Sequence, residues 1–388
     1  MQKTDYDENR FENWFKKYKS YFKPINHLIR LISIIVILLA VIELGSFALV
    51  EIYKSQKSDI DPRVDFDVYP NKSMAKDYFN EFQQSGQSEY YPYLGYRRVP
   101  DYSGKYINID ENSIRRTINK CNNTSKKIRI FMFGGSTLWG TGARDEGTIP
   151  SLLSGELCKS NPSIEVTNFG ENGYVSTQEM IKLQLELRAG NIPDIVIFYD
   201  GVNDVYSSFQ TYIMGQDEAG LPQNNQNRKD DFNSRNRFNL AGVFHNFYSL
   251  INSDQARRIL NNEKKVDRSI DPQLINDTAN IFLNNSRIIK SLEKEYNFKS
   301  FIYWQPAIYT KNILSEDEKN KIGITQELRD IFIQTSNKVV KSRDVHDITD
   351  VFNDYNSTIF IDWCHMAENG NEIIAKKMST DIQNYLTK

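Results

Sequence analysis

Residues 128–140 read IRIFMFGGSTLWG, an apolar run of strand length that ends in two glycines and a serine. A continuous apolar run bounded by turn residues is typical of a strand that is buried on both faces of a sheet. The glycine pair permits a tight turn and places Ser136 at the start of the next segment, which we expect to be helical. A serine in this position can expose its hydroxyl group at the end of the strand.

Further apolar runs of similar length follow this one, and helical segments separate them. We predict strands at residues 164–170, 194–200, 300–306 and 344–352. We predict helices at residues 176–188, 272–296, 325–341 and 369–386. This alternation predicts an α/β fold with a flavodoxin-like, doubly wound parallel sheet, in which ligands bind beyond the carboxyl ends of the strands.

Residues that could take part in catalysis lie at the carboxyl ends of the predicted strands. After the first strand, Ser136 offers a hydroxyl group and, at a helix amino terminus, a backbone amide that can donate to an oxyanion. The block NFGENGYVS (168–176) offers the amide of Gly173, with Gly170 as the alternative, and YDGVNDV (199–205) offers the side chain of Asn203. In DWCHMAENG (362–370), Asp362 and His365 are close enough to hydrogen-bond, so that the carboxylate orients an imidazole able to take the serine proton.

Each of these features has an ordinary structural explanation when it stands alone. A serine after two glycines is usually a helix cap, and a short Gly-X-Asn-Asp stretch is usually a turn. Their joint occurrence at successive strand ends is hard to obtain by accident. The sequence therefore predicts an acyl-transfer site built from Ser136, His365 and Asp362.

The four blocks, in this order, resemble the SGNH hydrolases, also called the GDSL esterase and lipase family. The resemblance covers residues 127–388 and implies an SGNH hydrolase fold with a serine nucleophile, a histidine base, its aspartate partner and three oxyanion donors. These implied site residues are Ser136, His365 and Asp362 for the triad, and Ser136, Gly173 and Asn203 for the oxyanion hole. The resemblance favours Gly173 over Gly170, because the family's glycine follows the asparagine of its block at the spacing of Asn168 to Gly173. One departure is Gly-Gly-Ser where the family name has Gly-Asp-Ser.

The resemblance implies a serine hydrolase that acts on ester bonds, and O-acetyl groups of envelope carbohydrate are the substrate we expect. Water as acceptor would make the enzyme a deacylase, whereas a sugar hydroxyl would make it an O-acyltransferase. One alternative is a lipid or lysophospholipid esterase, and another is a catalytically idle glycan-binding or scaffold module. The mechanism needs no cofactor and no metal ion.

Residues 31–50, LISIIVILLAVIELGSFALV, are long and apolar enough to cross a membrane as one helix. The segment is longer than a signal peptide's apolar region and lies further from the first methionine, so we predict a retained anchor. Of the basic residues that flank it closely, five lie before it (Lys16, Lys17, Lys19, Lys23, Arg30) and three lie after it (Lys54, Lys57, Arg63). The positive-inside rule then places the amino terminus in the cytoplasm and the catalytic domain outside the cytoplasmic membrane. Glu43 could mark a partner or proton path within the membrane, but a protonated or interfacial carboxyl is the reading we favour.

The expected organisation is a cytoplasmic tail (1–30), the anchor (31–50), a stalk and lead segment (51–126) and the catalytic domain (127–388). The lead is rich in turn residues and is expected to pack as a hairpin on the catalytic domain. Its arginines either line a glycan groove or cover a sheet edge (Arg97, Arg98, Arg115, Arg116). An insertion at about 210–239 is too polar to pack, and is either a lid or plain surface disorder.

The net charge and the cysteine spacing argue against two classes of ligand, nucleic acids and metal ions. The net charge of −2 provides no basic face for nucleic acid, so we expect none to bind. The three cysteines, Cys121, Cys158 and Cys364, lack metal-ligand spacing, and a Cys121–Cys158 disulfide is left open. Protein partners and oligomeric state are not indicated by the sequence.

Overall fold

The computed structural model describes residues 13–14, 16, 18, 27–48, 60–121, 127–213, 219 and 270–387. The chain divides into two compact units. The first comprises Met1–Asp59 and Asn227–Asp267, and the second comprises Ile60–Gln226 and Arg268–Lys388. The second unit contains the whole sheet and the predicted site.

In the first unit the main described element is an apolar helix, His27–Ala48, with a mean hydropathy of 2.6. Its large apolar side chains are exposed along its length, for example Leu31 at 55%, Ile37 at 61% and Leu44 at 68%. A helix of 22 residues rises about 33 Å, which matches the hydrocarbon thickness of a bilayer. The chain therefore has a helix near its amino terminus that is able to span a membrane, and its retention as an anchor stays a prediction.

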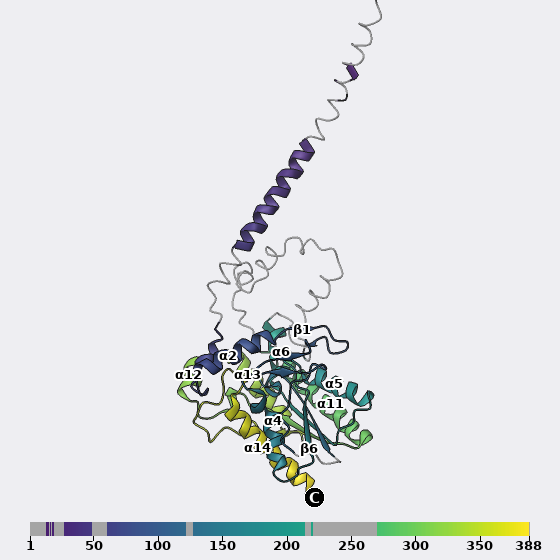
Figure 1. Ribbon diagram of the computed structural model, residues 1–388, viewed down its shortest axis with the longest axis vertical. Helices are drawn as coiled ribbons and strands as arrows, with labels where there is room; N and C mark the ends of the chain where they lie inside the picture. The colour runs from purple at the N-terminus through teal and green to yellow at the C-terminus, as the bar shows by residue number, and fades with distance from the viewer. Residues whose placement is uncertain are drawn as a thin grey trace, which may run out of the picture. The chain divides into compact units, whose positions relative to one another are not determined.

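The second unit is built on a parallel sheet of five strands (Figure 1). In chain order they are β5 (Ile128–Gly134), β6 (Ile164–Asn168), β7 (Ile195–Asp200), β8 (Lys299–Trp304) and β9 (His346–Asp347). Their spatial order, β6-β5-β7-β8-β9, is the flavodoxin-like order 2-1-3-4-5. The predicted fold class is confirmed.

The fifth strand is much shorter than the predicted 344–352. The Asp347 carboxylate accepts hydrogen bonds from the backbone N–H of Thr349 at 2.9 Å and from its hydroxyl at 2.7 Å. A side chain that bonds to the backbone two residues later makes a turn and competes with the sheet ladder. The strand therefore stops at Asp347.

Helices connect the strands and form two groups. They are α3 (Ser136–Trp139), α4 (Ile149–Cys158), α5 (Ser176–Arg188), α6 (Val202–Ile213), α11 (Pro272–Tyr296), α12 (Glu316–Lys321), α13 (Gln326–Val339) and α14 (Glu368–Leu386). Strands β6 and β7 lie on opposite sides of β5 in the sheet. Because the crossover connections of parallel strands are right-handed, α4, before β6, and α5, before β7, lie on opposite faces of the sheet. The contacts agree, because α14 packs on α4, whereas α5, α6 and α13 pack on α11. The carboxyl ends of the strands are thus left open between two helical layers.

An aromatic row stiffens the end of the sheet next to the predicted nucleophile. The ring of Phe133, on β5, stacks on Phe169 at 5.1 Å and on Phe198 of β7 at 5.2 Å between ring centroids. Such pairs contribute about 0.5–1.5 kcal/mol each beyond the area that they bury. The turn that follows β5 therefore starts from a rigid base.

Residues 60–121 also belong to the second unit. They form the 3-10 helix η1 (Pro62–Asp65), the helix α2 (Lys72–Gln84) and two short antiparallel hairpins, β1 (Ser88–Glu89) with β2 (Arg97–Arg98) and β3 (Tyr102–Ser103) with β4 (Asn108–Ile109). Tyr78 and Phe79 of α2 are buried in the main core. A disulfide between Cys121 and Cys158 joins the end of this segment to α4. We call residues 60–121 the lead segment below.

The predicted insertion at 210–239 lies almost wholly outside the described residues. Its first four residues continue α6 as far as Ile213.

Candidate active site

The nucleophile candidate Ser136 lies at the first turn of a helix that starts directly after β5. Gly135 is the N-cap residue of α3, and Ser136 is buried, with 7% of its surface exposed. The first N–H groups of a helix have no partner inside it, so the Ser136 amide is available at the same place as its hydroxyl group. Backbone geometry thus presents a donor and a nucleophile side by side.

His365 links this serine to an aspartate. His365 Nε2 lies 2.7 Å from Ser136 Oγ, and Nδ1 lies 2.7 Å from Asp362 Oδ2. Because a carboxylate only accepts hydrogen bonds, the proton is assigned to Nδ1, and Nε2 is left to accept from the serine hydroxyl. The three predicted triad residues are therefore brought together in the order that proton transfer from serine requires.

The aspartate is locked by its own loop. Asp362 Oδ1 accepts hydrogen bonds from the backbone N–H of Cys364 at 3.0 Å and of His365 at 2.8 Å. Burial alone would raise the pKa of Asp362, but the bonds from His365 and the charge of Arg63 outweigh it and hold that pKa well below its usual range. The carboxylate stays ionised throughout the physiological pH range.

Arg63 was not predicted to lie at the site. Its Nη1 donates to Asp362 Oδ2 at 3.3 Å, and its Nε and Nη2 donate to Asp61 at 3.0 and 2.8 Å. The guanidinium also lies over the ring of Phe79, 4.8 Å from its centroid. The lead segment therefore reaches the triad directly. An arginine near the predicted membrane segment is interpreted first as a topology signal, and nothing in its spacing points to Asp362.

Of the other predicted oxyanion donors, Asn203 lies against the turn that precedes Ser136. The Asn203 side chain donates to the Tyr174 carbonyl at 2.7 Å, and this bond holds its amide against Gly135. A Cβ atom at Gly135 would lie 1.9 Å from Asn203 Nδ2. Gly173 has a φ of +76°, which favours glycine, whereas the Gly170 amide is already donated to Asn168 Oδ1 at 3.0 Å. The geometry thus favours Gly173 over Gly170.

The lead segment also holds the loop that follows Ser136. The buried guanidinium of Arg115 donates to the carbonyls of Trp139, Gly140 and Ala143 at 2.7–3.0 Å. The Tyr78 hydroxyl donates to Gly140 O at 3.1 Å and accepts from the Gly142 amide at 2.8 Å. A glycan groove lined by all four predicted arginines is wrong, because Arg98 and Arg115 are 3% and 0% exposed. Arg115 instead bridges to Asn168 at the edge of the sheet, as the other interpretation expected.

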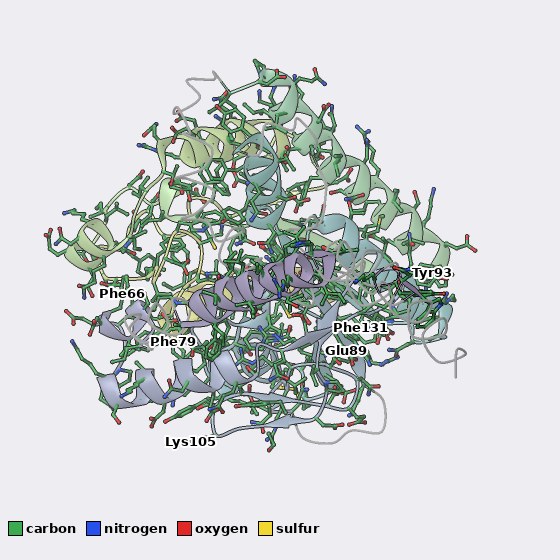
Figure 2. All side chains as sticks on the ribbon, turned by 90° about the horizontal axis from the view of Figure 1, so that it is seen from above. Phe66, Phe79, Glu89, Tyr93, Lys105 and Phe131 are labelled. Atoms are coloured by element: carbon green, nitrogen blue, oxygen red, sulfur yellow. A yellow bond between two sulfur atoms is a disulfide. The ribbon has the colours of Figure 1, made fainter. Side chains whose placement is uncertain are left out.

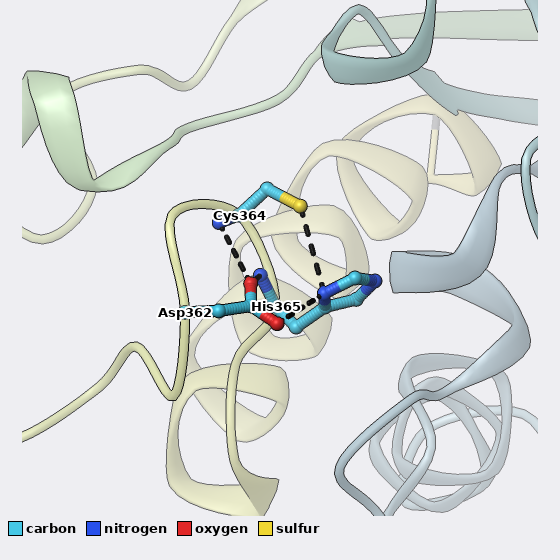
Figure 3. Close-up of side chains that lie close together, drawn as sticks. All are labelled: Asp362, Cys364 and His365. Carbon is cyan, nitrogen blue, oxygen red and sulfur yellow. Dashed lines mark hydrogen bonds and ion pairs between the residues drawn. The ribbon is translucent and has the colours of Figure 1, made fainter. Parts of the chain in front are cut away.

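Among the described residues, one group of possible metal ligands comes close together, and it is Asp362, Cys364 and His365 (Figure 3). Two of these residues are already bonded to each other through His365 Nδ1. The Cys364 thiol is 3.6 Å from that nitrogen and is buried, and burial raises its pKa well above the usual range. A protonated thiol is a poor metal ligand, so the group fits a triad better than a metal centre.

Comparisons with known proteins were made for the whole chain. No family model matches it, and neither does any curated protein. Three of the solved structures that match are an acetyl xylan esterase (17% identity, TM-score 0.35), a putative lipolytic protein of the G-D-S-L family from Desulfitobacterium hafniense (11%, 0.35) and a carbohydrate acetylesterase family member from Sinorhizobium meliloti (12%, 0.36). The matches cover 66–67% of this chain and 99–100% of theirs. At these TM-scores, activity has to be inferred from the site of this chain itself.

Proposed function

We propose that this protein is a membrane-anchored serine esterase or O-acyltransferase of the SGNH type, acting on ester-linked acyl groups. The observation that carries the proposal is the pair of 2.7 Å contacts that connect Ser136 through His365 to Asp362. A protein that only binds its ligand does not need a serine and a histidine within hydrogen-bonding distance of each other at a helix amino terminus. The same contacts weigh against an idle scaffold.

The proposed reaction begins when Ser136 Oγ attacks the acyl carbonyl carbon and His365 Nε2 takes the hydroxyl proton. The oxyanion accepts hydrogen bonds from the amides of Ser136 and Gly173 and from the Asn203 side chain. The tetrahedral intermediate collapses, the alcohol leaves with the proton from His365, and the acyl group stays on Ser136.

The second half-reaction releases the acyl group. Water or a second hydroxyl attacks the acyl-enzyme, and His365 takes its proton and returns it to Ser136 Oγ. Water yields a free acid, whereas a sugar hydroxyl yields a new ester, so hydrolysis and transfer share the first step. Asp362 stabilises the imidazolium in both halves.

We expect the substrate to be an O-acetyl group on carbohydrate of the cell envelope. This expectation rests on the resemblance of the four motifs to the SGNH family; two of the similar structures are named as an acetyl xylan esterase and as a carbohydrate acetylesterase family member. The alternative, a lipid or lysophospholipid ester, is favoured by the apolar helix that would hold the enzyme at a membrane.

The proposed location is the outer side of the cytoplasmic membrane, with the amino terminus in the cytoplasm. The helix His27–Ala48 supports a single span, and the excess of basic residues before it supports the orientation. The Cys121–Cys158 disulfide supports an oxidising compartment for the catalytic unit.

The direct test uses the full chain in detergent micelles with p-nitrophenyl acetate and longer acyl esters. Ser136→Ala and His365→Ala are compared with two matched controls, Ser291→Ala on α11 and His346→Ala on β9. We expect release that favours the acetyl ester, that falls by at least about 1,000-fold in both triad variants and that persists in the controls. Release that survives in both triad variants would refute the proposal, and a preference for long chains would support the lipid alternative.

A further inference from the structure

A cavity lies away from the triad, between the lead segment and the edge of the sheet. It encloses about 360 Å³ and is lined by Arg97 of β2, the turn around Ser113, Arg129 of β5 and Lys182 of α5. In the view of Figure 2, Tyr93 lies at the tip of the β1–β2 hairpin, on the same side of the molecule as Phe131, which also lines the cavity. None of the triad residues lines it.

The lining is mostly polar. Ser113 lies in its wall with a φ of +65°, and the Ser113 hydroxyl group is itself buried away from the open space of the cavity. The volume is at the lower end of small-molecule sites, and the walls offer too little apolar surface for a long acyl chain. A compact ligand rich in hydroxyl groups fits this lining.

The charges of the lining favour a ligand that carries a carboxylate. Three cations, Arg97, Arg129 and Lys182, face two carboxylates, Glu171 and Glu186. Glu171 is already engaged by buried Arg98, with Arg98 Nε at 3.5 Å.

Among the described residues, Arg129 is the cation of this lining that has no carboxylate partner. Its guanidinium donates to the Ile192 carbonyl at 3.0 Å and to the Asn191 side chain. The other two cations are paired, Arg97 with Glu89 at 2.8 Å and Lys182 with Glu186 at 2.7 Å. A planar guanidinium can bind a carboxylate through two parallel hydrogen bonds.

The cavity shares a wall with the proposed oxyanion loop. Gly170, Glu171 and Tyr174 line it, and the carbonyl of Tyr174 is the group that holds Asn203. The β1–β2 hairpin is bonded to the same loop, since the Tyr96 hydroxyl donates to Asn172 O at 2.6 Å. A polymer bound at the cavity would therefore lie one loop away from the nucleophile turn.

We propose that this cavity binds an acidic sugar residue, and that it serves as a subsite for the polymer whose ester reacts at Ser136. The role as a subsite rests on the proposed function, whereas the binding itself does not. Arg129 pairs with the sugar carboxylate, and Lys182, beside Glu186, adds positive charge to the same cavity.

The test is calorimetric titration of the full-length Ser136→Ala chain in detergent micelles, because this variant cannot consume an ester. The probes are trigalacturonic acid, neutral cellotriose and inorganic phosphate. The variants Arg129→Gln and Lys182→Gln are each added to Ser136→Ala, and Arg287→Gln on α11 is the matched arginine control. Thermal unfolding of each variant shows that a loss of binding is not a loss of the fold.

We expect trigalacturonic acid to bind at least about tenfold more tightly than cellotriose, a difference of about 1.4 kcal/mol. Binding should weaken by about tenfold in either cavity variant and stay unchanged in Arg287→Gln. Equal binding of the two trisaccharides, binding that both cavity variants retain, or binding of phosphate alone would overturn the proposal. If the esterase test fails while this binding persists, only the proposed function falls. If the esterase test succeeds and trigalacturonic acid does not bind, only the cavity proposal falls.

Discussion

At the scale of single residues, Gly135 lies directly against the side chain of Asn203. The side-chain amide of Asn203 occupies the space in which a Cβ atom at position 135 would lie. In this chain a Gly-Asp-Ser turn would displace the proposed oxyanion donor. Glycine at 135 is therefore part of the site geometry.

The first prediction follows from this contact. Gly135→Ala pushes the Asn203 amide away while leaving the serine and histidine in place, and loss of one oxyanion donor lowers kcat by about 100-fold or more. Steady-state kinetics with p-nitrophenyl acetate measure the effect, and Asn203→Ala should produce a loss of similar size. The double variant should be little worse than either single one, because both remove the same interaction. Additive losses would contradict this explanation.

Arg63 is the second case in which a single side chain has a role at the site. Its guanidinium lies 3.3 Å from Asp362 Oδ2 and is only 18% exposed. We infer that it positions the carboxylate and adds a positive charge beside the histidine–aspartate pair. It touches no reacting atom.

We predict that Arg63→Gln lowers kcat by about tenfold, or about 1.4 kcal/mol, with little change in KM. Arg63→Lys keeps a positive charge beside the Asp362 carboxylate and should restore part of the lost kcat. Steady-state kinetics with p-nitrophenyl acetate measure the effect. A kcat that Arg63→Lys does not restore would contradict a positioning role for this cation.

At the scale of elements, α5, β7 and α6 bury three carboxyl groups together. Glu179, Asp200 and Asp204 are between 0% and 3% exposed. Burial raises the pKa of Asp200 to about 8 and that of Asp204 to about 6, and burial beside Asp200 raises the pKa of Glu179. The folded chain therefore holds protons that the unfolded chain releases near pH 4, so stability falls as pH rises from about 4 to about 8.

The third prediction uses this dependence. Glu179→Gln replaces one acid of the cluster by a neutral group of the same shape, so its melting temperature should fall less than that of the wild type between pH 5 and pH 8.5. Each kcal/mol retained corresponds to about 2–4 °C in a domain of this size. Thermal unfolding across that range measures the difference. Parallel pH curves for the two proteins would show that the cluster does not titrate with folding.

The disulfide between the lead segment and α4 is a second feature at this scale. It closes a loop between residues 37 apart in sequence, Cys121 and Cys158. A cross-link of this span stabilises a fold by about 2–4 kcal/mol, largely by restricting the unfolded chain.

We therefore predict that Cys121→Ser lowers the melting temperature by roughly 5–15 °C. Dithiothreitol should lower the melting temperature of the wild type by a similar amount and leave Cys121→Ser unaffected, which separates the bond from the substitution. A wild type that does not respond to the reductant would contradict the disulfide.

At the scale of the whole molecule, the apolar helix and the α/β unit have separate roles. The helix carries no residue of the proposed site, and residues 60–121 belong to the compact unit that does. We predict that deletion of residues 1–48 releases the protein from membranes and leaves kcat for p-nitrophenyl acetate within about threefold, because the site is unaltered. Membrane flotation and esterase assays measure the two outcomes. A further deletion through Arg63 should lower activity, and equal activity of the two truncations would contradict a role for the lead segment.

Much of the fold and of the candidate site could be predicted from the sequence. Apolar strands that alternate with amphipathic helices encode a doubly wound sheet, because both signals are local and periodic. Parallel strands place their carboxyl ends at one edge, so Ser136, Asn203 and the block that contains Gly170 and Gly173 could be grouped from their order. The choice of Gly173 within that block depended on the family resemblance. Asp362 and His365 are three residues apart, and their pairing is also local. The apolar helix near the amino terminus depends on composition over a single segment.

The tertiary structure alone decided what depends on contacts between distant parts of the chain. The contact of Arg63 with Asp362, the burial of Arg115 under the nucleophile loop and the cavity beside Ser113 each join the lead segment to residues far away in sequence. No periodicity marks such contacts, because a buried arginine and an exposed one have the same letter, and only the packing around each decides whether water or a carbonyl satisfies it. Local sequence patterns thus determined the strands and the order of the candidate site residues along the chain. Tertiary packing decided which contacts hold those residues within hydrogen-bonding distance of one another.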